Sequence, residues 1–155
     1  MENLKKNHLK LEFEESFPIG AEREKMVYNY LAKNNNVNSI IYNDNSNYDL
    51  AVSTNSKKFT IEVKFDNMCL KTGNFAIENT SRRQPSGINT TKSDIWCVVD
   101  STDKMYFIKT KVLKELCVGK KQIQTRCEDS YNTVYLVKMV DFNKLSLDIE
   151  RFLNE

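Results

Sequence analysis

Residues Lys58 to Phe65 alternate between apolar and polar side chains, and this period of two is typical of an extended strand. The apolar set, expected to face the core, is Phe59, Ile61, Val63 and Phe65. The polar set, expected on the opposite face, is Thr60, Glu62, Lys64 and Asp66. Glu62 and Lys64 are therefore predicted to be neighbours on one face of a strand whose other face is buried.

A helix and two shorter strands are expected before this strand. An apolar stripe after residue 20 predicts the helix. The stripe consists of Met26, Val27, Tyr30 and Leu31. The asparagines at 34–36 are expected to end it, because asparagine tolerates the left-handed conformation. The strands are expected at 37–42 and 48–53, and a turn at 54–57 joins the second of them to the strand at 58–65 as a hairpin.

The remaining chain contains further short elements. Strands are expected at 74–78, 95–99, 105–108 and 134–140, a short helix at 112–116 and a closing amphipathic helix at 142–153. The order α-β-β-β, followed by mixed elements, predicts an α/β or mixed α+β fold with a central mixed β-sheet flanked by helices. Residues 1–18 are polar and irregular. A length of 155 residues without an internal repeat favours one domain, residues 1–155.

Composition excludes several classes of protein. No apolar run approaches the roughly 20 residues that span a bilayer, and no secretory signal is visible, so we expect a cytoplasmic protein without a membrane partner. The chain contains one histidine, and its four cysteines form no C-x-x-C pair, so we expect free thiols rather than a zinc site. These cysteines are Cys69, Cys97, Cys117 and Cys127.

Two carboxylates and an ammonium are expected to converge on the alternating strand. Asp49 lies on the preceding strand of the hairpin, where it can come alongside Glu62 and Lys64. Carboxylate oxygens bind Mg²⁺, which suits phosphodiester hydrolysis. The alternative is an ordinary solvent-facing Glu/Lys ion pair, which is the commoner role of such a pair.

The segments Tyr48-Asp49 and Ile61-Glu62-Val63-Lys64, preceded by a helix with Glu24, resemble the PD-(D/E)XK nuclease superfamily. The resemblance implies a restriction-endonuclease-like α-β-β-β-α-β core over about residues 20–100. It further implies that Asp49, Glu62 and the backbone carbonyl of Val63 bind Mg²⁺ or Mn²⁺, while Lys64 handles the attacking water.

The resemblance also implies a role for a glutamate on the first helix, and it has two departures. Resolvase-like members direct such a glutamate at the metal, and Glu24 fits that place, with Glu22 as second choice. Tyr48 stands where the family motif has proline. The helix after the Glu-x-Lys strand is hard to find, since residues 66–73 are short and polar.

A downstream block is similar to a pattern in phage nucleases of this superfamily, and its polar and glycine residues are candidates for phosphate contacts. With two neighbouring arginines, the nucleic-acid candidates are Arg82, Arg83, Ser86, Gly87, Thr91 and Lys92. A surface loop closed by a helix cap is an equally weighted alternative. Glu78 is expected either to extend the acidic group or to lie on an exposed strand.

These observations together favour a Mg²⁺- or Mn²⁺-dependent endonuclease that acts on DNA. A structure-specific, resolvase-like role encoded by a phage or mobile element is favoured over restriction, because the chain is too short for an added recognition domain. A homodimer is expected from the resemblance, RNA stays an alternative substrate, and a viral protein would act in the host cytoplasm. The rival hypothesis is a non-catalytic nucleic-acid-binding or structural viral protein that retains the fold.

Overall fold

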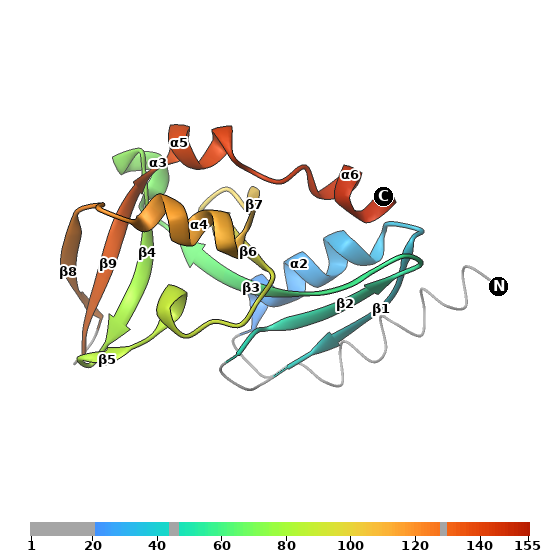
Figure 1. The fold of residues 1–155 in the computed structure, drawn as a ribbon, viewed down its shortest axis with the longest axis horizontal. Coiled ribbons are helices and arrows are strands. Elements are labelled where there is room, and N and C mark those ends of the chain that lie inside the picture. Colours follow the sequence, from blue (N-terminus) through green and yellow to red (C-terminus); the bar gives the residue numbers. More distant parts are fainter. Residues whose placement is uncertain (1–20, 44–46, 128–129) are drawn as a thin grey trace.

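The computed structural model of this chain describes residues 21–43, 47–127 and 130–155, so the expectation for residues 1–18 lies outside the described residues. The described residues form two β-sheets, which occupy opposite halves of Figure 1. Within the described residues, no helix is long and apolar enough to cross a membrane.

Sheet A has five strands in the order β1-β2-β3-β6-β7. They are β1 (Val37–Tyr42), β2 (Leu50–Thr54), β3 (Lys58–Asp66), β6 (Ile95–Asp100) and β7 (Met105–Lys109). Neighbouring strands are antiparallel except β3 and β6, which run parallel. The predicted hairpin is confirmed, because β2 and β3 pair with Ser53 opposite Lys58 and Leu50 opposite Ile61.

The first hydrophobic core lies between sheet A and helix α2 (Glu22–Ala32). Val27, Tyr28 and Leu31 of α2 are buried in it, as i, i+1 and i+4 positions of a helix form one face. The predicted stripe is therefore correct at Val27 and Leu31 but wrong at Tyr30, which is 36% exposed. Tyr30 instead lies at the margin of the core, where its ring stacks on Phe107 of β7 at 6.4 Å.

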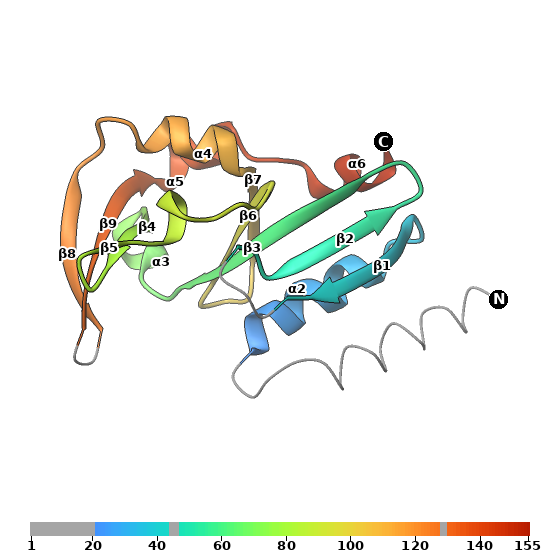
Figure 2. The same cartoon turned by 60° about the horizontal axis from the view of Figure 1, so that its bottom comes forward.

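Sheet B is antiparallel, with the order β5-β4-β9-β8. Its strands are β4 (Asn74–Ser81), β5 (Gln84–Pro85), β8 (Gln122–Cys127) and β9 (Ser130–Lys138). A second core joins its inner residues to Trp96 and Val98 of β6, and helices α4 (Thr110–Cys117) and α5 (Met139–Lys144) complete it. Strand β6 is buried throughout, as its apolar run predicts, because each face serves one core. Figure 2 shows α2 and α4 on opposite sides of sheet A.

The expected fold class is confirmed. A mixed five-stranded sheet has helices at its flanks, and the order α2-β1-β2-β3 is consistent with a restriction-endonuclease-like core. The connection from β3 to the parallel β6 differs from the expected single helix. It consists of the four-residue helix α3 (Cys69–Thr72), β4, β5 and the 3₁₀ turn η1 (Gly87–Asn89).

The closing helix expected at 142–153 is wrong, because two short helices, α5 and α6 (Ile149–Asn154), stand in its place. The Leu147 N–H donates to the carbonyl of Phe107 at 2.7 Å, so the segment between the helices is held against β7. Asp148 then starts α6 by accepting a hydrogen bond from the Arg151 N–H. Strands β5 and β8 also have no counterpart among the predicted elements.

Burial also bears on the thiols and on the C-terminal helix. Cys69, Cys97 and Cys117 are buried and free, as expected, and the side chain of Cys127 lies outside the described residues. Ile149 and Leu153 of α6 are buried in the first core. The apolar side chains of α6 therefore pack inside the protein.

Candidate active site

Strand β3 extends beyond the end of β2, and Asp49 lies at the point where the two strands separate. Their pairing ends at Leu50 opposite Ile61, and the Asp49 N–H still donates to the Ile61 carbonyl at 2.9 Å. Beyond it, the Val63 N–H donates to Asp49 Oδ2 at 2.7 Å. Because the N–H and C=O of one strand residue point to the same side, the Val63 carbonyl faces the edge that β2 has left.

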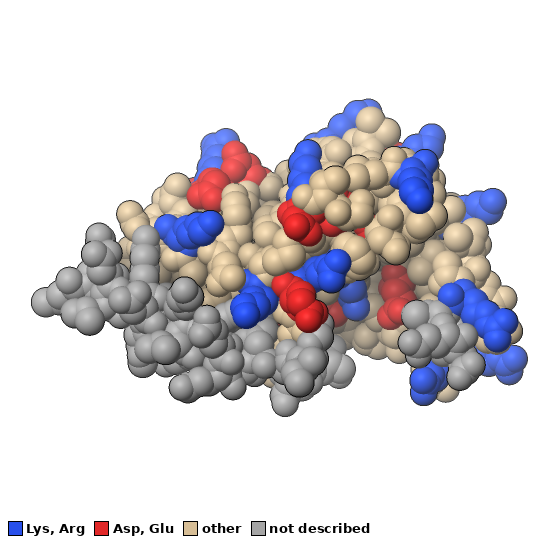
Figure 3. All heavy atoms as spheres, turned by 180° about the vertical axis from the view of Figure 1, so that it is seen from behind, with Lys and Arg blue, Asp and Glu red and all other residues tan. Residues whose placement is uncertain are grey.

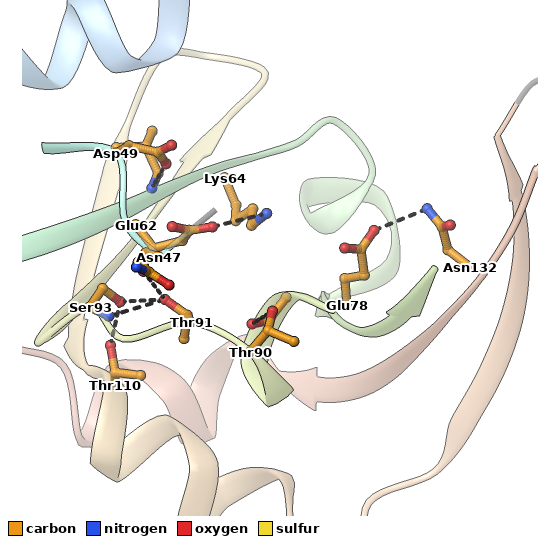
Figure 4. A network of polar contacts seen from close by, with 12 residues as sticks. Asn47, Asp49, Glu62, Lys64, Glu78, Thr90, Thr91, Ser93, Thr110 and Asn132 are labelled. Atoms are coloured by element: carbon orange, nitrogen blue, oxygen red, sulfur yellow. Dashed lines mark hydrogen bonds and ion pairs between the residues drawn. The ribbon is translucent and has the colours of Figure 1, made fainter. Parts of the chain in front are cut away.

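Glu62 and Lys64 lie on the opposite face of β3 from the residues that contact α2, as the alternation predicts. Glu62 Oε1 lies 3.3 Å from Lys64 Nζ, and their side chains are 12% and 36% exposed. They are opposite Trp96 and Val98 of β6, and Lys64 Nζ lies 5.7 Å from the centre of the Trp96 ring. A nearly buried carboxylate is thus paired with a lysine that solvent can still reach (Figure 4).

Glu24, Asp49, Glu62 and Lys64 form one electrostatic group, called here the charge cluster. Burial raises the pKa of Glu62 to about 7, Lys64 opposes this shift, and the charges of Asp49 and Glu24 add to it. Burial likewise raises the pKa of Asp49, against the Val63 hydrogen bond and Lys64. Burial raises the pKa of Glu24, and Asp49 adds to that shift. The structure therefore brings together the residues that the sequence singles out, and Glu24 is the glutamate of α2 on which the charges of Asp49 and Lys64 act.

The donor set of the charge cluster fits a hard cation. Among residues 21–43, 47–127 and 130–155, no three His, Cys, Asp or Glu side chains are close enough together to hold a metal ion. Mg²⁺, however, keeps several waters and takes only one or two protein carboxylates. Asp49 and Glu62, with the Val63 carbonyl nearby, offer only oxygen atoms, which agrees with Mg²⁺ or Mn²⁺ and not with a thiolate-bound metal.

A network of buried hydroxyl groups holds the segment before Asp49, and sequence reasoning missed it. The Thr91 hydroxyl lies 2.9 Å from the Ser93 hydroxyl and 3.3 Å from the Asn47 carbonyl, and Ser93 lies 3.0 Å from the Thr110 hydroxyl (Figure 4). The backbone N–H of Lys92 also donates to the Asn47 carbonyl. Thr91 is 5% exposed. Its hydroxyl thus supports the protein chain, which agrees with the loop alternative rather than with a phosphate contact.

Gly87 approaches backbone of the protein itself. Its φ is +52°, and a Cβ atom built there would lie 2.2 Å from the carbonyl oxygen of Glu78 on β4. The Ser86 N–H donates to the Asn79 carbonyl, which fixes this turn against the same strand. The reason for glycine at 87 is therefore internal packing, and the expected close approach to a phosphate is not its cause.

The basic residues expected as a group are divided between two places. Arg82 and Arg83 are exposed and form the turn between β4 and β5, with φ angles of 51° and 66°. The Arg82 N–H donates to the Tyr131 carbonyl of β9, whereas Lys92 is held beside Asn47. Glu78 accepts a hydrogen bond from Asn132 at 3.0 Å, so part of its carboxylate serves sheet B (Figure 4).

No family model, curated protein or solved structure matches this chain. What the protein does must therefore be inferred from the site. Seen from behind, acidic side chains in the middle of the molecule are bordered by basic ones (Figure 3). This pattern suits a negatively charged ligand. The basic side chains would attract its ends, and a bound cation would separate its middle from the carboxylates.

The raised pKa of Glu62 predicts how the stability of the metal-free protein depends on pH. The folded state retains the Glu62 proton up to about pH 7, whereas the unfolded chain loses it near the ordinary value of 4.5. The free energy of unfolding should therefore fall as pH rises through this interval, by on the order of 2 kcal/mol from Glu62. Replacing Glu62 with glutamine should remove this part of the slope, measured by urea unfolding in EDTA at pH 5 and pH 8.

The exposed Glu22 provides the control for that experiment. Glu22→Gln makes the same chemical change at an exposed carboxylate, so the difference between the pH slopes of the two variants isolates what the buried position of Glu62 contributes. An unchanged slope for Glu62→Gln would show that Glu62 is not desolvated as described.

Proposed function

We propose that this chain is a metal-dependent endonuclease that hydrolyses DNA phosphodiester bonds at the charge cluster. The observation that carries the proposal is the separation of β2 from β3. At that point the carboxylate of Asp49 accepts a hydrogen bond from the Val63 N–H, between the positions of Glu62 and Lys64 on β3. A purely structural Glu62–Lys64 ion pair requires neither the second, partly buried carboxylate of Asp49 nor the strand edge that β2 leaves. Substrate phosphate and a cation account for both.

Asp49 and Glu62 would hold Mg²⁺ or Mn²⁺, with the Val63 carbonyl as a further oxygen donor. Glu24 would reach the ion through one of the waters that such a cation keeps. When bound, such a cation polarises the phosphate and lowers the pKa of a coordinated water. The residues of the chain position the reactants. The Val63 N–H fixes Asp49, and burial of Glu62 beside Trp96 keeps bulk water from one side of the cluster.

Lys64 would act on the attacking water and on the phosphate. Its ammonium group is held 3.3 Å from Glu62 yet remains 36% exposed, so it can donate a hydrogen bond outward while it stays in place. A positive charge so placed also stabilises the negative charge that develops on the phosphate oxygens. Lys64 is thus the candidate catalytic residue supplied by β3.

Resemblance to structure-specific nucleases favours a resolvase-like substrate, and the exposed Arg82, Arg83 and Lys92 would contact its phosphates. We extend the proposal to a homodimer that cuts two strands, encoded by a phage or mobile element and acting in the host cytoplasm. A non-catalytic binding protein is the second candidate. It is favoured by one observation, the ion pair with Lys64 that already occupies one oxygen of Glu62.

The proposal is tested by incubating supercoiled plasmid, branched DNA and RNA with the protein in Mg²⁺, Mn²⁺ or EDTA. We expect cleavage of DNA only in the presence of a divalent cation. Glu24→Gln should lower the rate by about 10- to 100-fold if this carboxylate helps to hold the metal. Glu22 lies two positions before Glu24 in α2 and is exposed, so Glu22→Gln should cleave like the unmodified protein.

Each outcome decides between the candidates. Absence of cleavage in every substrate and metal, together with retained DNA binding, would establish the non-catalytic alternative. A larger loss for Glu22→Gln than for Glu24→Gln would show that the helix presents the other glutamate to the site.

A further inference from the structure

Arg23 of α2 is held on the ring of Phe65, the residue that follows Lys64 on β3. The centre of its guanidinium group lies 3.8 Å from the ring centroid, close enough for a strong cation–π contact. Phe65 is 44% exposed, unlike the other apolar residues of its strand face, so its prediction as a core residue is wrong. Beyond β2 the strand leaves the core, and the ring of Phe65 serves as a platform for Arg23.

The donors of Arg23 are poorly satisfied within the protein. Its Nε atom is buried and has no hydrogen-bond partner in the part of the chain that the structure describes. Neither the Lys64–Glu62 nor the Arg151–Glu155 ion pair involves Arg23. Buried polar groups are normally hydrogen-bonded, so a guanidinium of this kind points to an acceptor supplied by a ligand.

The position of Arg23 relates this missing acceptor to the charge cluster. The charges of Asp49 and Lys64 act on Glu24, its neighbour in the sequence. Its ring partner Phe65 follows Lys64 on β3, with the side chain on the opposite face of the strand. Arg23 therefore lies next to Glu24 in α2 and against the end of β3, on the α2 side of that strand. The planar fork of arginine matches the oxygens of a phosphate diester, and the aromatic contact fixes that fork without neutralising its charge.

We propose that Arg23, seated on Phe65, binds a phosphate of the nucleic-acid strand adjacent to the one at the charge cluster. This inference rests on the proposed nuclease function for the position of the strand, but phosphate binding can be measured without cleavage. The ligand is a phosphodiester backbone of any base sequence, because the contact would reach no base edge.

The experiment measures binding of fluorescent single-stranded and duplex oligonucleotides in EDTA, over a range of salt concentrations. Arg23→Ala should weaken binding about tenfold and lower the slope of log K against log salt concentration by about 1. Phe65→Leu keeps the charge, so we expect weaker binding with an unchanged slope. Arg23→Lys keeps the charge but lacks the planar fork of arginine, so its affinity should lie between those of Arg23→Ala and the unmodified protein.

Arg151→Ala is the matched control, because Arg151 is an exposed arginine of α6 that pairs with Glu155. It should bind like the unmodified protein, and thermal melts should show that all four variants are folded. Unchanged affinity and slope for Arg23→Ala, with active cleavage by the unmodified protein, would overturn the phosphate role and leave the nuclease proposal intact. A loss of binding in Arg23→Ala without any cleavage by the unmodified protein would support the phosphate site and overturn the nuclease proposal.

Discussion

Replacing Lys64 with alanine is expected to lower the rate of DNA cleavage by about 100- to 10,000-fold, the range for loss of a group that acts on the proton or charge of the transition state. The ammonium group of Lys64 lies beside the nearly buried Glu62 and is still reached by solvent, so its removal takes both a donor and a positive charge away from the charge cluster. The measurement is the single-turnover rate on plasmid or branched DNA in saturating Mg²⁺.

Lys58→Ala is the matched control for this prediction. Lys58 lies on the same strand, is exposed, and pairs with Ser53 at the far end of the hairpin. It should cleave like the unmodified protein. Equal rates for Lys64→Ala and the unmodified protein would contradict the catalytic role of Lys64. A comparison of DNA binding in EDTA separates a loss of chemistry from a loss of affinity, and we expect the larger change in the rate.

Gly87→Ala is expected to reduce the free energy of unfolding by about 3 kcal/mol or more, which would be among the largest effects of a single substitution. Two costs add at this position. The positive φ of 52° disfavours any L side chain, and the new methyl group would lie 2.2 Å from the backbone oxygen of Glu78. Because that obstacle is backbone of a central strand of sheet B, it cannot move aside as a flexible side chain can.

Gly119→Ala separates the two costs. Gly119 has a φ of +74°, but apart from its chain neighbours no atom of the described residues lies within 4 Å of the position its Cβ would take. Its substitution should therefore cost only the conformational strain, about 1 kcal/mol. Urea unfolding of both variants measures the difference. Similar losses for the two substitutions would mean that the contact between η1 and β4 yields easily.

The charge cluster was predictable because local patterns encode most of it. Strict alternation at 58–65 places Glu62 and Lys64 on one face, and the hairpin turn at 54–57 brings Asp49 alongside them. Glu24 required the family resemblance in addition. Arg23 and the buried Thr91 network carry no such signal, since their partners lie 42 and 44 positions away at Phe65 and Asn47.

The errors in the fold have the same origin. The pattern at 142–153 is amphipathic, but the edge of β7 offers a carbonyl at Phe107, and that hydrogen bond interrupts the helix at Leu147. Strand β8 escaped prediction because its residues, Gln122–Cys127, are mainly polar and obtain their extended form by pairing with β9. Both cases depend on partners outside the segment itself, Phe107 for the interrupted helix and β9 for β8, which a local period cannot reveal.

The strand edge that β2 leaves has a consequence for the solubility of this protein. No strand among the described residues pairs with β3 on this edge beyond Ile61. Such a stretch is a template on which a strand of another molecule could add, and proteins commonly guard these edges with charged side chains. The carboxylate of Asp49 occupies the Val63 N–H that an incoming strand would need. The same side chain is therefore a gatekeeper against aggregation, and an inactive Asp49 variant must be shown to be monodisperse before its inactivity is assigned to chemistry.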